Sequence, residues 1–174
     1  KAGLGLMMNV PGNAKPLPFV EDTAVSPEKL PEFVGRFDDI IRQHGTEAGY
    51  YGHASVGCLH IRPLINLKDT EDVNKMVSIA EQISDLVLEF GGAMSGEHGD
   101  GLARSGWNEK MFGSRIYQVF REVKQIFDPD NIMNPGKIVD APSMSANLRT
   151  DPGTNSLNIE TGLDFRKQGN MSGA

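Results

Sequence analysis

Apolar residues recur at the spacing of amphipathic helices in three stretches of the chain. The first begins at residues 26–28, Ser-Pro-Glu, where serine can cap a helix and proline is tolerated in the first turn. The second begins near residues 69–70 and ends at the glycine pair 91–92. The third runs from about Ser114 to the Asp-Pro pair at 128–129, which stops it. The apolar positions with a helical period are Leu30, Phe33, Val34, Phe37, Ile40 and Ile41, then Val73, Met76, Val77, Ala80, Ile83, Val87 and Phe90, then Ile116, Val119, Phe120, Val123, Ile126 and Phe127.

Strand-like segments lie between these helices. They cover residues 3–10, 47–54 and 57–67, and a fourth, shorter one covers residues 93–95. The resulting order is strand, helix, strand, strand, helix, strand, followed by the third helix. This order predicts an α+β fold of the ferredoxin-like kind, an antiparallel sheet with helices on one face, plus a C-terminal helical segment.

The hydrophobic period ends after Val139. Of the 35 residues from 140 to 174, 17 are Gly, Pro, Ser, Thr or Asn, and the apolar residues among them follow no period. We therefore expect one domain at residues 1–139 and a linker or tail at residues 140–174. The chain begins with lysine and no charged-then-apolar signal segment follows, so we interpret it as a piece of a longer protein.

Composition narrows the class of protein. A net charge of −6 and a pI near 5.2 argue against a nucleic-acid-binding module, which needs a basic surface to neutralise phosphates. No apolar run approaches the ~18 residues that cross a bilayer. The single cysteine, Cys58, excludes a disulfide framework and a four-cysteine metal site within this chain.

Three of the four histidines fall in two glycine-rich segments, residues 52–60 and 95–101. His53 and His60 are seven residues apart, which on one unbroken strand would put their rings on opposite faces. A turn at residues 55–57 would instead make a hairpin whose two strands aim both rings into one pocket. The alternative is that they are unrelated surface or packed histidines.

The second segment adds a carboxylate and an imidazole side by side. Six glycines lie between residues 91 and 106, too many for a stable helix or strand interior, so we expect a loop there. Glu97 could complete a two-histidine, one-carboxylate metal site with open positions, and His98 could act as a general base. The alternative is an ordinary flexible loop whose glutamate and histidine face water.

The two histidine segments, followed by Phe-Asp-Pro-Asp-Asn-Ile-Met-Asn-Pro-Gly-Lys at residues 127–137, resemble the C-terminal domain of FAD-linked oxidases. These are flavoproteins of the vanillyl-alcohol oxidase type, and the resemblance covers roughly residues 3–140. The chain also resembles a subgroup of large fusion proteins with an iron–sulfur region after this domain. Residues 140–174 would then be the linker that leads to that region.

The resemblance implies roles for particular residues. It makes His53, His60 and Glu97 the ligands of a divalent metal, with zinc the expected ion. It makes His98 the base that removes the substrate hydroxyl proton while the α-hydride goes to the flavin. It places Asn134, in the Asn-Pro-Gly-Lys turn, next to the flavin ring.

One position departs from the family pattern. Two residues after the second histidine the family often has an asparagine that contacts the substrate, whereas this chain has Arg62. An arginine can bind a carboxylate bidentately, so we expect Arg62 to contact a carboxylate substrate.

The expected function is therefore the substrate- and metal-binding domain of a flavin-dependent enzyme that oxidises a 2-hydroxy acid of the D-lactate, glycolate or D-2-hydroxyglutarate type. FAD would be held mainly by a missing N-terminal domain, so the isolated piece should be inactive. Electrons would pass to an iron–sulfur region or a quinone, and the location would be cytoplasmic or peripheral at the inner membrane. Two alternatives are a non-catalytic ferredoxin-like binding or regulatory module and a self-sufficient metal hydrolase with the same ligands.

Overall fold

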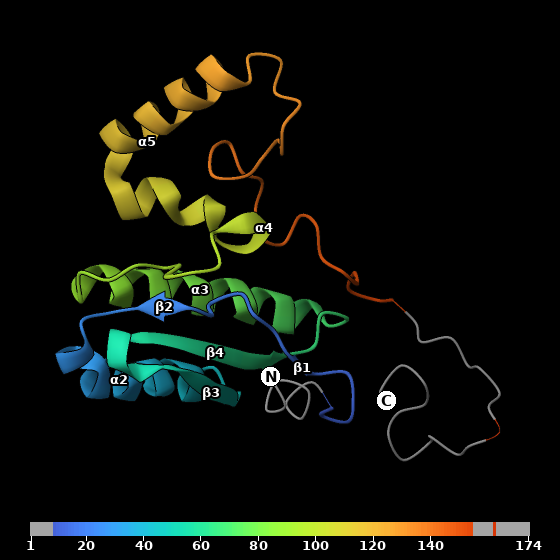
Figure 1. Ribbon diagram of the computed structural model, residues 1–174. Helices are drawn as coiled ribbons and strands as arrows, with labels where there is room; N and C mark the ends of the chain where they lie inside the picture. Colours follow the sequence, from blue (N-terminus) through green and yellow to red (C-terminus); the bar gives the residue numbers. More distant parts are fainter. Residues whose placement is uncertain (1–8, 155–161, 163–174) are drawn as a thin grey trace.

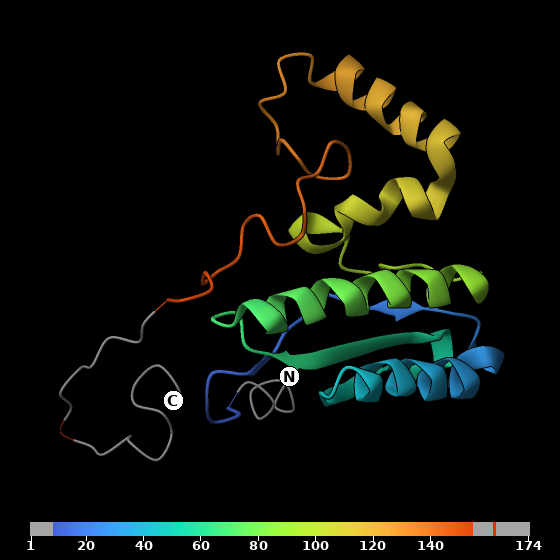
Figure 2. The same ribbon diagram turned by 180° about the vertical axis from the view of Figure 1, so that it is seen from behind.

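The computed structural model describes residues 9–154 and residue 162. Its centre is an antiparallel sheet covered on one face by two helices, α2 (Leu30–Gln43) and α3 (Thr70–Glu89), which contact each other (Figures 1 and 2). The central strand is β4 (Cys58–Ile65), and β3 (Ala48–His53) pairs with one of its edges. This arrangement is the α+β sheet with helices on one face that the sequence predicts.

Two short strands, β1 (Lys15–Pro16) and β2 (Thr23–Ala24), lie end to end along the other edge of β4. Pro16 pairs with Leu64 and Thr23 pairs with Leu59, so this edge contains two more residues than β4 does over the same distance. The extra residues bulge out of the ladder, and Asp22, with φ 55°, lies in the bulge.

An isolated bridge from Ala24 to Ala93 adds one further pairing beside β2. Taken across the sheet, the order is residue 93, the interrupted strand 15–24, β4 and β3, which is the ferredoxin-like order. The fourth strand expected at 93–95 is therefore reduced to this single bridge. Most of the strand expected at residues 3–10 lies outside the described residues.

The two covering helices begin and end close to where the sequence predicts. A short 3-10 turn, η1 (Pro27–Lys29), leads into α2, and the Asp69 side chain caps α3 by accepting the Glu71 N–H at 2.8 Å. Their apolar faces and the covered face of the sheet make one core, in which each fully buried large side chain contributes roughly 1.5–3 kcal/mol. The core residues with no exposed surface are Val20, Phe33, Phe37, Ile41, Ile61, Ile79, Ala80, Ile83 and Val87.

The glycine-rich segment 91–106 is not wholly a loop, which corrects our expectation. It contains a four-residue helix, α4 (Gly101–Arg104), and a 3-10 turn, η3 (Ser105–Trp107). The Arg104 side chain is buried and bonded to the edge strand, so tertiary contacts outweigh the entropic cost of the glycines.

The third helix, α5 (Asn108–Phe127), begins six residues earlier than expected and bends at Gly113, whose φ is 79°. It projects away from the sheet (Figure 1). Much of its apolar stripe is exposed: Phe112, Ile116, Val119, Val123, Ile126 and Phe127 are between 45% and 75% accessible. Within the described part of the chain, this stripe therefore remains largely uncovered.

The chain after Val139 lies over the domain surface as far as it is described. Met144 and Leu148 pack against the core cluster, and the Gly153 N–H donates to Lys68 O at 2.9 Å. The division at residue 139 thus remains a prediction. No helix within the described ranges is both long enough and apolar enough to cross a membrane.

Candidate metal and proton-transfer site

The β3–β4 hairpin brings the two histidines of the first segment together. His53 pairs with Cys58, and Tyr51 pairs with His60, so these side chains share one sheet face. On β4 the opposite face, which includes Ile61, packs under the helices. The histidines therefore lie on the face away from α2 and α3, where the predicted turn has brought them.

The turn itself depends on one glycine. Residues 54–56 form a 3-10 turn, η2 (Ala54–Val56), and Gly57 closes it in the left-handed region with φ 72°. A Cβ at Gly57 would lie 1.8 Å from Val25 O, so any larger residue would push the hairpin off the edge strand.

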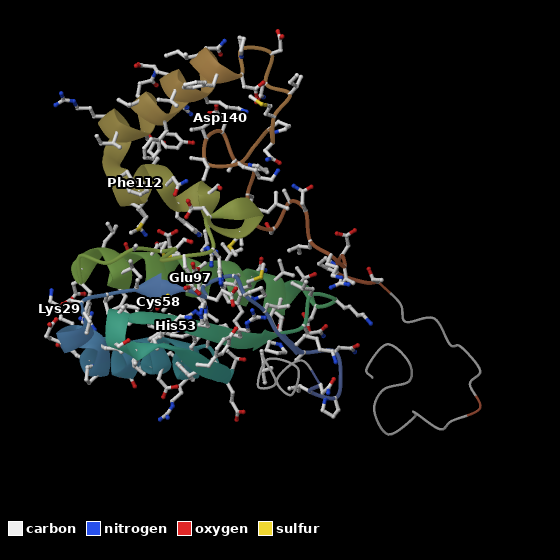
Figure 3. All side chains as sticks on the ribbon, viewed as in Figure 1. Lys29, His53, Cys58, Glu97, Phe112 and Asp140 are labelled. Atoms are coloured by element: carbon white, nitrogen blue, oxygen red, sulfur yellow. The ribbon has the colours of Figure 1, made fainter. Side chains whose placement is uncertain are left out.

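Glu97 reaches this face from the loop after α3. Its Oε1 lies 3.0 Å from His60 Nε2 and 3.7 Å from His53 Nε2. His98 Nε2 lies 3.1 Å from the same oxygen. Figure 3 shows Glu97 beside His53 and Cys58, and the four residues expected to carry the chemistry are thus brought together around one carboxylate oxygen.

The loop that carries Glu97 and His98 is held by a residue that the sequence analysis missed. Asp22 Oδ2 accepts the Ser95 hydroxyl at 2.9 Å, the Glu97 N–H at 2.9 Å and the His98 N–H at 2.7 Å. Burial alone would raise the pKa of Asp22, but these N–H donors and the Arg104 charge outweigh it and hold this pKa below its ordinary value. Asp22 is therefore an anion that fixes the backbone of the site.

Arg104 completes the anchor from α4. Its guanidinium lies 2.7 Å from Asp22 Oδ1 and donates to Glu21 O at 2.5 Å and to Gly99 O at 2.6 Å. The charge is buried but paired, as a buried charge must be. No spacing or motif marked Asp22 or Arg104, because their partners come from distant parts of the chain.

A second unpredicted carboxylate, Glu21, contacts the side chains of the site. Its Oε1 lies 3.2 Å from His98 Nδ1, and its Oε2 lies 2.6 Å from an Arg62 nitrogen. Arg62, which we expect to bind a substrate carboxylate, is therefore already paired on one side. The buried Arg62 Nε has no hydrogen-bond partner among the residues that the structure describes.

Aromatic contacts fix the orientation of His60, the most buried ring of the cluster. It stacks against His98 with centroids 4.9 Å apart, and the Tyr51 ring lies tilted beside it with centroids 4.8 Å apart. On the same strand, burial together with the nearby carboxylates raises the pKa of the Cys58 thiol. Cys58 is therefore a packed neutral thiol.

The donor set fits a divalent cation. Ligand atoms at 2.0–2.2 Å from one tetrahedral ion are separated by roughly 3.4 Å, close to the 3.0 and 3.7 Å that separate Glu97 Oε1 from the two histidine nitrogens. All three ligand atoms lie within 4.8 Å of one another. Imidazole nitrogen with carboxylate oxygen is an ordinary set for zinc. His53, His60 and Glu97 would hold the ion.

Asn134 lies apart from this cluster. It follows α5 in a loop that Asp128 holds by accepting the Ile132 and Met133 N–H groups at 3.0 and 2.9 Å. Its φ is 48° and its side chain is exposed. Among the described residues, no hydrogen bond or ion pair joins Asn134 to the histidines, so its role toward a flavin remains a prediction.

Comparison with known proteins shows the family of the chain. The family described as FAD linked oxidases, C-terminal domain, matches residues 1–138. D-2-hydroxyglutarate dehydrogenase of Haemophilus influenzae is 42% identical over 138 residues, which are 79% of this chain and 13% of that protein. The Escherichia coli protein of the same name is 39% identical over 149 residues, which are 83% of this chain and 14% of that protein. D-lactate dehydrogenase of Archaeoglobus fulgidus is 35% identical over 121 residues, which are 69% of this chain and 26% of that protein.

The chain spans 13–26% of the length of these relatives. The family match, in contrast, covers most of the chain and includes the hairpin, the Glu97 loop and the turn at Asn134. The chain therefore belongs to the C-terminal domain family of the FAD-linked oxidases, a family of oxidoreductases.

Proposed function

We propose that this chain is the substrate- and metal-binding domain of a flavin-dependent enzyme that oxidises a 2-hydroxy acid to the 2-oxo acid. The observation that carries the proposal is the convergence of His53, His60 and Glu97, with His98 Nε2 3.1 Å from the same Glu97 oxygen. Relatives named D-2-hydroxyglutarate dehydrogenase and D-lactate dehydrogenase support this substrate class.

The reaction removes a proton from the substrate hydroxyl and a hydride from the adjacent carbon. When bound, a divalent ion held by the three ligands supplies Lewis acidity for the hydroxyl oxygen, and FAD supplies the hydride acceptor. His98 takes the proton at Nε2, because this nitrogen faces the ligand cluster while Nδ1 faces Glu21. The hydride carries both electrons, so the organic product is the 2-oxo acid.

Arg62 would hold the substrate carboxylate. Its guanidinium is planar and pairs with Glu21 through Nη2. A carboxylate entering beside Glu21 could therefore meet other guanidinium donors. Arg62 also lies near the Tyr51 ring, 5.9 Å from its centroid, which limits where the guanidinium can point.

The remainder of the enzyme would cover α5. The relatives are several times longer than this chain, and the family description calls this part a C-terminal domain, which supports a further, flavin-binding part before it. The exposed stripe that includes Ile116 and Val123, together with the turn at Asn134, is the surface offered to that part, and Figure 3 shows Phe112 of α5 well apart from His53. An iron–sulfur region or a quinone would then accept the electrons, in the cytoplasm or at the inner membrane.

The contact between the α5 stripe and the flavin-binding part is tested in the complete enzyme by the double variant Ile116→Lys with Val123→Lys. We expect FAD content to fall while zinc content stays unchanged, because the stripe is remote from the ligands. Leu88→Lys on α3, an exposed apolar residue outside the stripe, is the matched control. Full FAD content in the double variant would mean that the flavin-binding part docks elsewhere.

Turnover of D-2-hydroxyglutarate, D-lactate and glycolate by the complete enzyme, before and after metal chelation, tests the function itself. We expect oxidation of at least one acid, loss of turnover on chelation and recovery on addition of Zn²⁺. A non-catalytic module would bind no metal and oxidise none of them. A self-sufficient hydrolase would instead cleave ester or amide bonds without flavin.

A further inference from the structure

The loop that follows α5, residues 128–140, contains a strained backbone position. Ile138 has φ 67°, in the left-handed region, where a β-branched residue is a genuine outlier because its Cβ crowds a carbonyl oxygen. Its side chain is exposed, so burial of apolar surface does not explain the conformation. Strain of this kind persists only where the surrounding structure holds it, and it concentrates at functional sites.

Two buried polar side chains hold Ile138 in this conformation. The Ser105 hydroxyl accepts the Ile138 N–H at 2.9 Å, and the Asn108 side-chain amide donates to Ile138 O at 3.0 Å. Ser105 is 1% exposed and Asn108 is 2% exposed. The Ser105 hydroxyl donates in turn to Gly101 O at 2.6 Å, so α4 fixes its direction. Ser105 and Asn108, which we call the Ile138 clamp, therefore bind both polar backbone groups of one strained residue.

The clamp begins directly after the anchor of the candidate metal site. The preceding residue, Arg104, pairs with Asp22, which holds the backbone of the Glu97–His98 loop. Two consecutive residues thus hold two loops that are far apart in the sequence, since Arg104 supports the Glu97–His98 loop and Ser105 supports loop 128–140. Figure 1 shows α4 between the sheet and the chain that follows α5.

The surface that the clamp holds is suited to contact with another part of a protein. Ile132 and Met133 are exposed apolar residues that follow the exposed stripe of α5 along the chain. Loop 128–140 is also tied at its far end, where the Asp140 N–H donates to the Tyr117 hydroxyl at 2.9 Å. An apolar surface fixed in this way is preorganised, which lowers the entropy lost on binding.

We propose that Ser105 and Asn108 are positioning residues, which hold loop 128–140 at a set place relative to the Glu97–His98 loop, so that substrate and flavin meet in the geometry of hydride transfer. This role rests on the function proposed above, in which the flavin-binding part covers the α5 stripe and the turn at Asn134. Transfer requires reacting atoms roughly 3–3.5 Å apart, and a misplacement of about 1 Å can lower the rate about 10²-fold. The clamp would prevent such a misplacement.

A purely structural role for the clamp leads to a different result. Ser105 and Asn108 would then stabilise the fold, and their loss would change the fraction of enzyme that is folded. The rate constant of the folded, FAD-loaded enzyme would stay the same. The rate constant of FAD reduction therefore separates the two roles, because it is measured only on enzyme that holds FAD.

Two variants weaken the clamp from different sides. Ser105→Ala removes the acceptor of the Ile138 N–H, and Asn108→Asp replaces the donor to Ile138 O by a carboxylate, which only accepts. Asn108 is the first residue of α5, where an acidic side chain suits the helix dipole, so Asn108→Asp should keep the helix. Thr46→Val is the matched control, because it removes a hydroxyl that donates to Leu64 O at 2.7 Å on the sheet.

The first readout is amide hydrogen exchange of the 174-residue chain, followed by NMR. We expect the Ile138 N–H to exchange about 5–10-fold faster in Ser105→Ala, the change that follows from losing one hydrogen bond. Exchange at Glu97 and His98, whose N–H groups bond to Asp22, should stay unchanged, as should the Zn²⁺ affinity. Unchanged exchange at Ile138 overturns the proposal. Lower Zn²⁺ affinity also overturns it, because Ser105 would then support the metal site itself.

The second readout is rapid-mixing kinetics of FAD reduction in the complete enzyme, with whichever of D-2-hydroxyglutarate, D-lactate and glycolate the unmodified enzyme oxidises. We expect the rate constant at saturating substrate to fall about 10–100-fold in Ser105→Ala and Asn108→Asp. The dissociation constant of the substrate and the zinc and FAD contents should stay the same. Thr46→Val should keep the full rate constant. A full rate constant in both clamp variants leaves the clamp a purely structural role and overturns the proposal.

A double-mutant cycle with Ile138→Asn tests whether Ser105 acts through Ile138. Asparagine adopts the left-handed conformation more readily than isoleucine, so it needs the clamp less. Ser105→Ala should therefore slow FAD reduction less in the Ile138→Asn background than in the unmodified enzyme. Equal slowing in both backgrounds would show that the hydroxyl acts elsewhere, which contradicts the proposal.

Failure of the proposed function would appear differently. If the unmodified complete enzyme reduces its FAD with none of the three acids, the proposed function fails and the positioning role fails with it. If it reduces FAD and the two clamp variants do so at the same rate, only the positioning role fails.

Discussion

Arg104 Nη1 lies 2.7 Å from Asp22 Oδ1, and the side chains of both residues are almost completely shielded from solvent. The pair joins α4 to the bulge in the edge strand, and Asp22 uses its other oxygen to hold the loop of Glu97 and His98. The candidate metal and proton-transfer site is therefore supported by a buried ion pair.

Replacing Asp22 by asparagine should destabilise the fold strongly. The substitution leaves the Arg104 charge buried and without its anion, and breaking a buried pair in this way costs about 3–5 kcal/mol. Urea unfolding at pH 7 measures the change in the free energy of unfolding.

Glu89→Gln is the matched control for this experiment. It breaks the Arg36–Glu89 pair between α2 and α3, which is exposed on both sides. Exposed pairs contribute about 0–1 kcal/mol, so this variant should unfold almost like the unmodified chain. A similar small loss in Asp22→Asn would show that the buried pair does not support the loop.

Zinc affinity should depend on three of the four site residues. His53→Ala and Glu97→Gln each remove a donor, so the dissociation constant for Zn²⁺ should rise by more than the roughly 10–100-fold that loss of an outer-shell partner costs. Isothermal titration of the 174-residue chain measures it.

His44→Ala provides the control for zinc binding. His44 is the one histidine outside the two glycine-rich segments. It follows the end of α2, where its ring bonds to Ile40 O and to the Ser78 hydroxyl of α3. Its loss should leave zinc affinity unchanged. Equal affinity in His53→Ala and His44→Ala would remove His53 from the ligand set.

The loop that carries Asn134 should lose stability in acid. The hydrogen bond from Lys124 holds the pKa of Asp128 below its ordinary value of 3.8 and outweighs the effect of partial desolvation. The Ile132 and Met133 N–H groups lower this pKa further. A carboxylate whose pKa is lower in the folded state stabilises the fold fully at pH values above its unfolded-state pKa of 3.8. This stabilisation is lost as the pH falls through the lower pKa of the folded state. The unfolding free energy of Asp128→Asn should therefore differ from that of the unmodified chain at pH 7, and the difference should shrink toward pH 3.

Urea unfolding at both pH values measures this difference, and Asp130→Asn, the exposed neighbour in the same loop, is the control. A difference that is the same at pH 3 and pH 7 would show that the Asp128 charge does not act in the folded loop.

The parts of the structure that depend on local pattern could be predicted from the sequence. The helical period located α2 and α3. His53 and His60 are seven residues apart, so they can share one sheet face only if the chain turns between them, and Gly57 closes that turn. Each of these follows from neighbours in the chain, where spacing determines which side chains share a face.

The supporting residues could not be predicted in this way. Glu21 and Asp22 lie in a bulge, where the alternation of a strand is broken, and their partners His98 and Arg104 are more than 70 residues away. Nothing in the spacing of charged residues indicates such contacts. Similarly, the glycines of segment 91–106 indicated a loop, whereas the buried Arg104 stabilises a short helix there.

His98 should be the base of the proposed reaction, and His98→Asn in the complete enzyme tests this. Asparagine keeps a polar side chain of similar reach but cannot take the hydroxyl proton at this position. Because general-base catalysis contributes about 10²–10⁴-fold, kcat should fall by that factor. Metal content should stay the same, since the three ligands His53, His60 and Glu97 remain.

The metal measurement separates this role from that of a ligand. Loss of bound zinc in His98→Asn would make His98 a ligand and would challenge the place of Glu97, whose Oε1 lies 3.1 Å from the same ring. Undiminished turnover would mean that another group takes the proton. His44→Asn, remote from the site, should keep both metal and turnover, so that a fall in kcat confined to His98→Asn traces the proton transfer to this ring.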